Sequence, residues 1–247
     1  MADTSIWKEL EEHDLNGYTL VIPSVAVGNV GQLACDLLIS SLSMKKIASV
    51  YSEAFIPVVG YDPYDLRSDR ISSCCEVFAS NEKRLVLMQL RAPLVYKYAE
   101  SFLLAVVRKF KEKAIKDIVI LTSSFAHEKK HIQSSAFRYV SSALSPHKDL
   151  IQSLNWVSHT NEDNNLRIHG GGFATLLYKL AEDESVPCLV LYKYCSEGDN
   201  IPDAYDTVCC LNTVIPLFRK EEDLQSQIIQ PVSWKLLFGK PPPQDIY

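Results

Sequence analysis

The chain has 247 residues, of which 47% are hydrophobic and 22% are charged, and its formal net charge at pH 7 is −5. This composition is ordinary for a globular protein with a sizeable core, and it excludes a chain that is disordered throughout. The acidic balance and the scattered lysines and arginines give no basic surface for nucleic acid, so we expect no nucleic-acid partner.

Residues 1–15 are predicted to form a polar N-terminal segment ahead of a single domain over residues 16–230. Residues 1–14 lack the apolar core of a signal peptide, and no run reaches the roughly 18 apolar residues of a membrane span. We therefore expect an intracellular protein with no membrane partner.

The domain opens with a strand, a glycine turn and a helix, and the rest of the chain is organised around this unit. Residues 18–22 predict a strand, and apolar residues recur at helical spacing over residues 30–42. Gly28 and Gly31 allow a sharp turn between the two, and Asn29 is a candidate N-cap. The apolar run at residues 47–51 predicts a second strand, reached by a parallel crossover.

The next elements indicate a mixed sheet. After a loop rich in proline and tyrosine at residues 55–64, apolar runs at residues 74–79 and 84–91 flank a polar turn and predict an antiparallel hairpin. Residues 95–114 follow the pattern of an amphipathic helix. Residues 117–121 are almost fully apolar, which favours a central strand that is buried on both faces.

The second half continues the alternation after an irregular stretch at residues 122–165, which holds a short helix at 146–154 and an exposed loop at 158–165. A triple glycine at residues 170–172 precedes a helix that starts at Phe173. A strand at 187–194, a polar loop at 196–203 and a last helix follow. The order predicts an α/β protein: a three-layer α/β/α sandwich with a mixed, mostly parallel sheet. Residues 231–247 are predicted to be an extended Pro-rich tail, because three consecutive prolines cannot continue a helix.

No group of residues makes a compelling catalytic site. The glycine turns are candidates for phosphate binding, but close packing of a helix on the sheet explains them equally well. Ser123 and Ser124 precede His127 without the G-x-S-x-G elbow of a hydrolase. His169, beside the triple glycine, is the one histidine that merits a test.

Two further groups have simple structural interpretations. The acidic residues Glu197, Asp199 and Asp203 are placed to cap a turn and the helix after it. The seven cysteines include no C-x-x-C pair and mostly lie in apolar runs, so we expect buried free thiols and no metal site; they are Cys35, Cys74, Cys75, Cys188, Cys195, Cys209 and Cys210.

Three stretches resemble the proteasome assembly chaperone family. They are residues 22–34, which read IPSVAVGNVGQLA and are followed by DLLI at 36–39, the triple glycine at 170–172, and SEGDNIPDA at 196–204; residues 234–239 are similar as well. The resemblance implies an α/β sandwich related to the nucleoside phosphorylase-like fold. It also implies a protein that is not an enzyme, needs no cofactor, and is found in the cytoplasm and nucleus.

The same resemblance implies two protein partners. It implies a heterodimer with proteasome assembly chaperone 1, which binds α-type subunits of the 20S proteasome, promotes α-ring assembly and hinders off-pathway association. An alternative is a nucleoside phosphorylase-like enzyme that holds phosphate with Gly28, Gly31 and His169. The two differ in a simple property, because a subunit of an obligate dimer should self-associate when it is produced alone.

The resemblance gives the C-terminal tail a role. Related chaperones end in a hydrophobic residue, a tyrosine and one further residue, which enter pockets between neighbouring α subunits. Here Ile246 and Tyr247 end the chain, so the tyrosine lies one position late. The resemblance thus implies that Ile246 and Tyr247 dock on the α ring.

Overall fold

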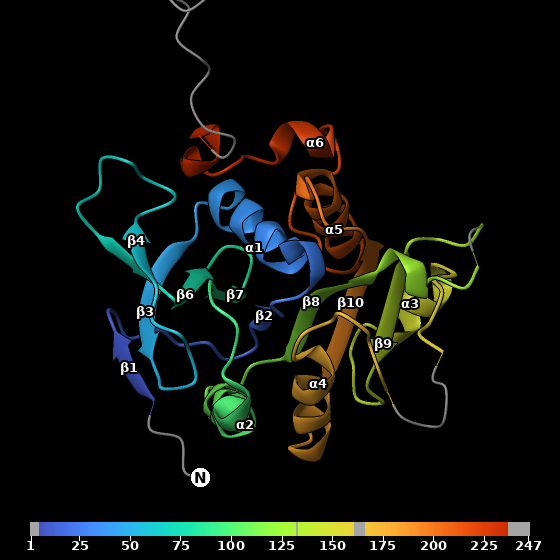
Figure 1. The fold of residues 1–247 in the computed structure, drawn as a ribbon, viewed down its shortest axis with the longest axis horizontal. Helices are drawn as coiled ribbons and strands as arrows, with labels where there is room; N and C mark the ends of the chain where they lie inside the picture. The colour runs from blue at the N-terminus through green and yellow to red at the C-terminus, as the bar shows by residue number, and fades with distance from the viewer. Residues whose placement is uncertain (1–4, 132, 161–165, 237–247) are drawn as a thin grey trace, which may run out of the picture.

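The computed structural model describes residues 5–131, 133–160 and 166–236. Its centre is an eight-stranded mixed sheet in the order β1-β3-β6-β7-β2-β8-β10-β9 (Figure 1). The strands are β1 (Ile6–Glu9), β2 (Thr19–Pro23), β3 (Lys45–Tyr51), β6 (Cys75–Ser80), β7 (Leu85–Leu90), β8 (Asp117–Phe125), β9 (Phe137–Ser141) and β10 (Cys188–Cys195).

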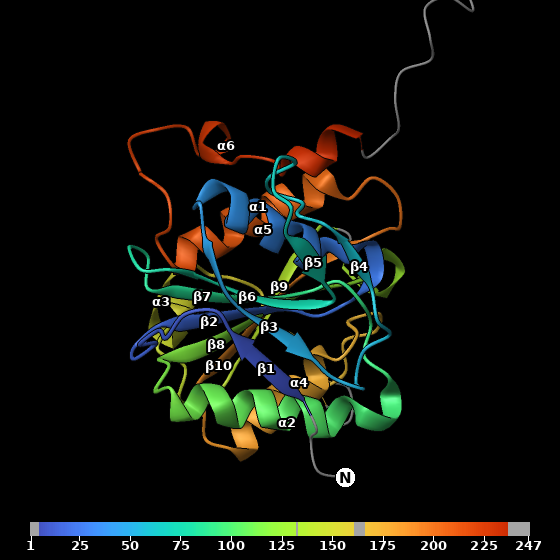
Figure 2. The ribbon, with the colours of Figure 1, turned by 90° about the vertical axis from the view of Figure 1, so that its left-hand side faces the viewer.

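Helices cover both faces of this sheet, as the three-layer prediction requires. Figure 2 shows α1 (Val30–Ser41) and α5 (Ile201–Val214) on one face, and α2 (Tyr96–Glu112) and α4 (Ala174–Asp183) on the other. Side chains alternate between the two cores along each strand. In β2, for example, Leu20 and Ile22 pack on the α2 and α4 side, whereas Val21 packs on the α1 and α5 side.

The share of parallel pairs is smaller than predicted. The pairs β2–β7, β2–β8 and β8–β10 are parallel, whereas β1–β3, β3–β6, β6–β7 and β9–β10 are antiparallel. The sheet is therefore mixed but mostly antiparallel. Short strands added at its two edges are the reason, because each one pairs antiparallel with the strand beside it.

The predicted crossover from the first strand through the helix reaches a different position from the one expected. β3 runs in the same direction as β2, but the hairpin of β6 and β7 lies between them. The predicted hairpin and the central position of β8, between β2 and β10, are confirmed. Asn29 does occupy the N-cap position of α1, but its φ of 51° is left-handed and its side chain makes no capping bond.

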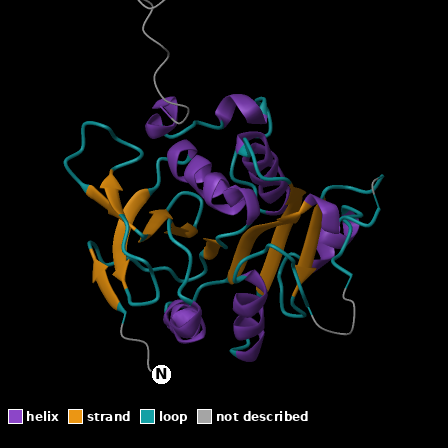
Figure 3. Ribbon diagram, viewed as in Figure 1, coloured by secondary structure: helices purple, strands orange, loops and turns teal. Residues whose placement is uncertain are grey.

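Several short elements have no clear sequence signal. β4 (Val59–Tyr61) and β5 (Ile71–Ser73) form a separate two-stranded ribbon in the region predicted to be a loop. β9 forms an edge of the sheet within the irregular stretch, next to the predicted short helix, α3 (Lys148–Ser153). β1 lies within residues 1–15, and the short helix α6 (Leu224–Gln227) precedes a 3-10 turn at Val232–Leu236 (Figure 3).

The prediction of free, mostly buried thiols is confirmed. All seven cysteines are free; five are buried, and Cys209 and Cys210 are half-buried. Within the described ranges no three His, Cys, Asp or Glu side chains converge as a metal site would require. In the same ranges, every helix is too short or too polar to cross a membrane.

Candidate functional site

The carboxyl ends of β2 and β8 are covered by two segments that we call the glycine loops, residues 24–29 and 169–172. Three hydroxyl groups of β8 and that of Ser24, in the first loop, donate to carbonyl oxygens of these loops. Ser24 and Thr122 both donate to Gly171, over 2.8 and 3.0 Å. Ser123 donates to the carbonyl of Val27, and Ser124 to that of His169. The loops are thus fixed on the strand ends by hydrogen bonds within the chain.

The glycines in these loops are needed because other parts of the chain pass very close to them. A Cβ on Gly172 would lie 2.1 Å from the carbonyl oxygen of Val25, and the residue has a φ of +60°. A Cβ on Gly31, at the start of α1, would lie 2.4 Å from the carbonyl oxygen of Leu121. Both distances are far below any van der Waals contact. The glycines therefore allow close packing of loop, helix and sheet, which is one of the two interpretations left open by the sequence.

The structure does not bring the serines and His127 together. Ser123 is fully buried, and its hydroxyl is used by the Val27 carbonyl. His127 is exposed and stacks on Phe125, with ring centroids 5.2 Å apart. His169 is exposed beside Gly170.

The acidic residues before α5 cap and anchor that helix. Asp199 accepts a hydrogen bond from the backbone N–H of Ile201, and Asp203 accepts one from the Asn200 side chain at 2.8 Å. Asp203 also forms an ion pair with Lys193 at 2.6 Å. The predicted capping role is confirmed for Asp199 alone, because Asp203 lies within the first turn of α5 and contacts the side chains of Asn200 and Lys193; Glu197 is exposed.

A different feature stands out on the surface, around the β4–β5 ribbon. Val59 and Tyr61 on β4 are 75% and 88% exposed, and Ile71, which pairs with Tyr61 across the ribbon, is 67% exposed. Three more apolar side chains of the neighbouring loops are exposed as well. We call the group the ribbon surface: Ile56, Val58, Val59, Tyr61, Leu66 and Ile71.

The ribbon surface has the chemistry of a protein-binding site. Single exposed apolar residues are common, but exposed apolar residues that gather on one short ribbon mark contact surfaces. The ribbon pairs only with itself within the described residues, so each of its strands also presents an open edge. Sequence reasoning missed this surface, because only the pairing of β4 with β5 places Tyr61 beside Ile71.

A buried network holds the base of the ribbon to the body of the protein. The hydroxyl of Tyr64, three residues after β4, donates to Asp36 of α1 at 2.5 Å and accepts from Arg91 at 2.9 Å. Arg91 also pairs with Asp36 at 2.9 Å, and Gln89 donates to the same carboxylate. Burial, and then the charge of Asp36, raise the pKa of Tyr64 well above its usual value, so the phenol stays protonated as a donor.

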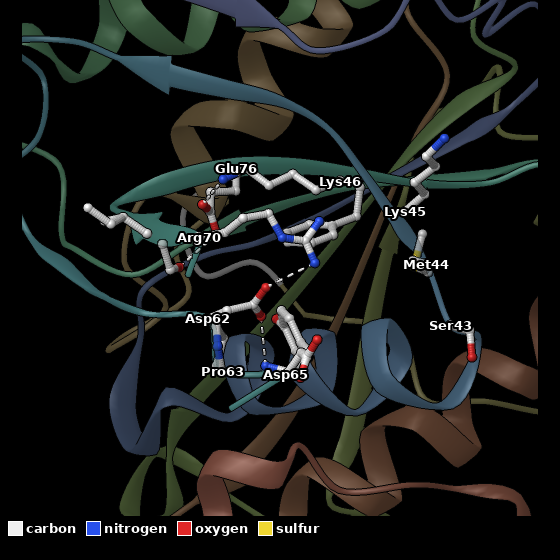
Figure 4. A pocket seen from close by; sticks show the side chains of 13 residues that line it. Ser43, Met44, Lys45, Lys46, Asp62, Pro63, Asp65, Arg70 and Glu76 are labelled. Carbon is white, nitrogen blue, oxygen red and sulfur yellow. Dashed lines mark hydrogen bonds and ion pairs between the residues drawn. The ribbon is translucent and has the colours of Figure 1, made fainter. Parts of the chain in front are cut away.

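A polar pocket of about 370 Å³ lies between the ribbon, β3 and the end of α1 (Figure 4). Arg70 and Asp62 approach each other across it at 3.3 Å. Glu76, on β6, pairs with Lys46 and accepts hydrogen bonds from the Ser72 hydroxyl and the Ser73 backbone. Three basic and three acidic side chains stand among the described lining residues, so the formal charges of the pocket balance and its polar groups support the ribbon.

The predicted docking residues Ile246 and Tyr247 lie outside the residues that the structure describes. The same is true of the three consecutive prolines. The described part of the predicted tail ends in the turn at Val232–Leu236, where Trp234 packs on the α1 and α5 core.

Comparison with known proteins gives consistent matches over nearly the whole chain. The model of the PAC2 family matches residues 20–228. Proteasome assembly chaperone 2 from Bos taurus is 36% identical over 257 residues, which cover 95% of this chain and 96% of that protein. Proteasome assembly chaperone 2 from Danio rerio is 34% identical and covers 90% and 92% of the two chains.

Solved structures share the fold at low sequence identity. Pyrococcus furiosus PbaA, described as an archaeal homolog of proteasome-assembly chaperone, superposes with a TM-score of 0.67 at 17% identity, covering 91% of both chains. Pyrococcus furiosus PbaB, described as an archaeal proteasome activator, gives a TM-score of 0.64 at 18% identity and covers 92% and 93%.

Proposed function

The chain belongs to the PAC2 family, and on this premise we propose that it is a proteasome assembly chaperone subunit. In this proposal it pairs with proteasome assembly chaperone 1. The heterodimer binds α-type subunits of the 20S proteasome, promotes formation of the α ring and hinders off-pathway association. The chain itself contributes binding surfaces and no catalytic chemistry.

One observation carries the proposal: the identity of about one third to relatives named proteasome assembly chaperone 2 runs over more than nine tenths of their length. The match therefore includes the core, both helical layers and the loops. A domain that shared only the scaffold would match at the level of the archaeal structures, below one fifth identity.

The ribbon surface supports the pairing part of the proposal. A subunit that is incomplete without its partner leaves apolar side chains in water, and the partner covers them. We assign the ribbon surface to the partner chaperone, because its six apolar side chains form the kind of contact core that stable heterodimers bury. Tyr61 at its centre is the residue type that most often anchors such interfaces.

The packing of the glycine loops favours a binding protein over a phosphorylase. Gly28 and Gly31, which the alternative assigns to phosphate, face Asn200 and the Leu121 carbonyl so closely that a Cβ would clash, so packing alone explains both glycines. His169 contributes its carbonyl to the packing of the sheet edge, and its exposed side chain lies in the lining of a separate pocket at the ends of β8 and β10. An enzyme of this kind would need those groups around an open cavity.

The C-terminal residues remain a separate part of the proposal. Ile246 and Tyr247 are assigned to a pocket between neighbouring α subunits. Their role rests on the resemblance alone and is tested independently of the ribbon surface.

The test is affinity purification of the tagged chain from its own cells, with mass spectrometry of the bound proteins. We expect the partner chaperone and α-type subunits, with few mature β-type subunits. A variant with Val59→Ser, Tyr61→Ser and Ile71→Ser should lose the partner. A truncation that removes residues 245–247 should keep the partner and lose α-type subunits.

Tyr96→Ser is the matched control, because Tyr96 is 97% exposed but lies at the start of α2, in the opposite layer from the ribbon. It should retain all partners. If the wild-type chain returns alone or with metabolic enzymes, the proposed function is wrong. If the wild-type chain recovers the expected partners and the ribbon variant recovers them equally well, the chaperone role stands and the partner surface lies elsewhere.

A further inference from the structure

A second pocket, of about 190 Å³, lies at the carboxyl ends of β8 and β10, beside the glycine loops, with which it shares His169. Strand register brings its floor together. Tyr194 of β10 pairs with Ser124 of β8, and Arg138 of β9 pairs with Tyr192 of β10. Since residues two apart on a strand share a face, all of these side chains lie on the side of the sheet that α4 covers.

The rim of the pocket is made by two loop segments that the backbone holds in place. The backbone N–H of His159 donates to the carbonyl of Tyr139 at 2.8 Å. The carbonyl of His169 accepts from the Ser124 hydroxyl. We call the resulting group the basic pocket: Ser124, Arg138, His159, Arg167, His169 and Tyr194.

The charge of this pocket is unusual for an acidic protein. Two arginines and two histidines line it together with Lys130 and His131, whereas Glu128 is the one carboxylate among the described lining residues. Glu128 lies 3.6 Å from His127, and His127 is not part of the lining. Even with Lys130 left out of the count, two arginines stand against one carboxylate among the described lining residues, in contrast to the balanced pocket beside the ribbon.

Arg138 is the centre of this charge. It is only 9% exposed, and within the described ranges no carboxylate lies at ion-pair distance from it. Its guanidinium donates to the carbonyls of Ser135 and Phe137 and to the hydroxyl of Ser134. A guanidinium has five N–H donors, so two are left for another acceptor. Its cation also lies 5.4 Å from the ring of Tyr194.

The neighbouring histidine reports the same excess of positive charge. His159 Nδ1 lies 2.7 Å from the hydroxyl of Tyr192, which in turn lies 3.4 Å from the hydroxyl of Tyr194. Burial, and then the charges of Arg138 and His169, lower the pKa of His159. An anion in the pocket would oppose the two charge effects.

We propose that the basic pocket binds a phosphate group. Arg138 with its two unused N–H donors, the exposed guanidinium of Arg167 and imidazole rings line one small cavity, and a multi-oxygen anion requires donors of these kinds. The volume is below that of ordinary small-molecule sites, so it suits a free phosphate ion or the phosphate of a monoester whose remainder lies outside. The pocket is distinct from the glycine turns, and the proposal does not depend on the chaperone role.

The experiment titrates inorganic phosphate into the full chain and follows backbone amide resonances and the melting temperature. Sodium chloride at matched ionic strength is the reference, and adenosine monophosphate is a parallel arm for the ester source. We expect saturable shifts at Arg167, His169 and Tyr194 and a rise in the melting temperature with phosphate but not with chloride. Adenosine monophosphate that binds more tightly than phosphate would identify the ester as the source, and the reverse order would identify the free ion.

Variants separate the pocket from general charge effects. Arg138→Gln should weaken phosphate binding roughly tenfold or more, because a buried charge-assisted donor is lost. Arg167 is exposed, so the Arg167→Gln variant should fold normally. It should weaken phosphate binding roughly threefold, because an exposed charge contributes less than a buried one. Arg219→Gln is the matched control, since Arg219 is exposed, far along the chain and paired with Glu222.

Three outcomes would overturn the proposal. They are an equal response to phosphate and chloride, wild-type affinity in both Arg138→Gln and Arg167→Gln, or an equal loss in Arg219→Gln. If Arg138→Gln fails to fold, Arg167→Gln and His159→Asn decide the question. A phosphate response that is unchanged in both of them shows that the basic pocket is not the site.

Discussion

The glycine loops and the ribbon surface meet opposite surroundings, although short irregular segments build both. At the glycine loops the hydroxyls of Ser24, Thr122, Ser123 and Ser124 find acceptors within the chain, and glycines let the backbone pack without gaps. On the ribbon surface, apolar side chains such as Tyr61 point into water. In open α/β sheets the strand ends are the usual ligand site. Here most hydrogen-bonding groups at the ends of β2 and β8 are paired within the chain. The exposed apolar surface lies instead on a ribbon outside the main sheet.

The difference indicates how this fold can serve as a binding protein. The crevice at the ends of β2 and β8 is closed by the chain's own atoms, so changes there should act on folding. The ribbon is held by a small polar network and contributes little apolar area to the core, so changes there should act on binding. Matched substitutions in the two regions separate an effect on folding from an effect on binding.

Gly172→Ala should be the most destabilising of these substitutions. Its Cβ would meet the Val25 carbonyl at 2.1 Å, and the residue would have to keep a positive φ. Overpacking and left-handed backbone together cost about 3 kcal/mol or more of unfolding free energy. Urea unfolding, followed by far-UV circular dichroism, measures the loss.

Gly60→Ala is the matched substitution in the other region. Nothing lies within 4 Å of a Cβ added to Gly60, which is exposed in the middle of β4. Its unfolding free energy should stay within about 0.5 kcal/mol of the wild type. Equal losses in both variants would show that the glycine loops are not the tightly packed region described above.

Tyr64→Phe should have a moderate effect and should act on the ribbon more than on the core. The change removes a hydroxyl that donates to Asp36 and accepts from Arg91. Hydrogen bonds to charged groups contribute about 1.5 to 3 kcal/mol, and we expect the lower end because Arg91 still pairs with Asp36. The substitution should accelerate amide hydrogen exchange more in β4 and β5 than in β2 and β8.

Tyr61→Phe provides the comparison, because the Tyr61 side chain is 88% exposed. It should leave the free energy of unfolding within about 0.5 kcal/mol of the wild type and leave exchange in the ribbon unchanged. Faster exchange throughout the sheet in Tyr64→Phe would mean that the network supports the core as a whole, and the distinction between the two regions would be weaker.

The reach of sequence reasoning follows the same division between regions. The first strand-turn-helix unit, the hairpin of β6 and β7 and the central strand β8 are confirmed, because each carries its own periodicity and turn residues. β4, β5 and β9 have three to five residues each and no such pattern, since pairing with a neighbour creates them.

The sites follow the same rule. The glycine turns were visible as candidates because glycine itself is the signal. The ribbon surface and the basic pocket depend on register. Tyr61 meets Ile71 only through the pairing of β4 with β5, and Arg138 and Tyr194 come together only through the edge strand β9. No spacing along the chain contains that information.

The smallest effect concerns pH and tests whether the sheet edge beside the glycine loops differs from them. The pKa of His159 is lowered by burial and by Arg138 and His169, whereas in the unfolded chain it lies near 6.5. Between these two values the unfolded state binds more protons, so stability should rise with pH through this window and fall as pH drops below about 6.5. Burial raises the pKa of Tyr192, whose hydroxyl contacts His159, so this phenol stays neutral in the same window.

His159→Asn should flatten this dependence, seen as the difference in urea midpoint between variant and wild type from pH 5.5 to 7.5. Because His159 is only half-buried, we expect a small difference, largest at the acidic end. Phosphate in the basic pocket should make this difference smaller still, since an anion stabilises the imidazolium of His159 and raises the pKa of His159. A pH profile that is identical in the variant and the wild type would mean that His159 is solvated like a surface residue. The sheet edge at β10 would then be an ordinary solvated surface, and the contrast with the packed glycine loops would be one of exposure alone.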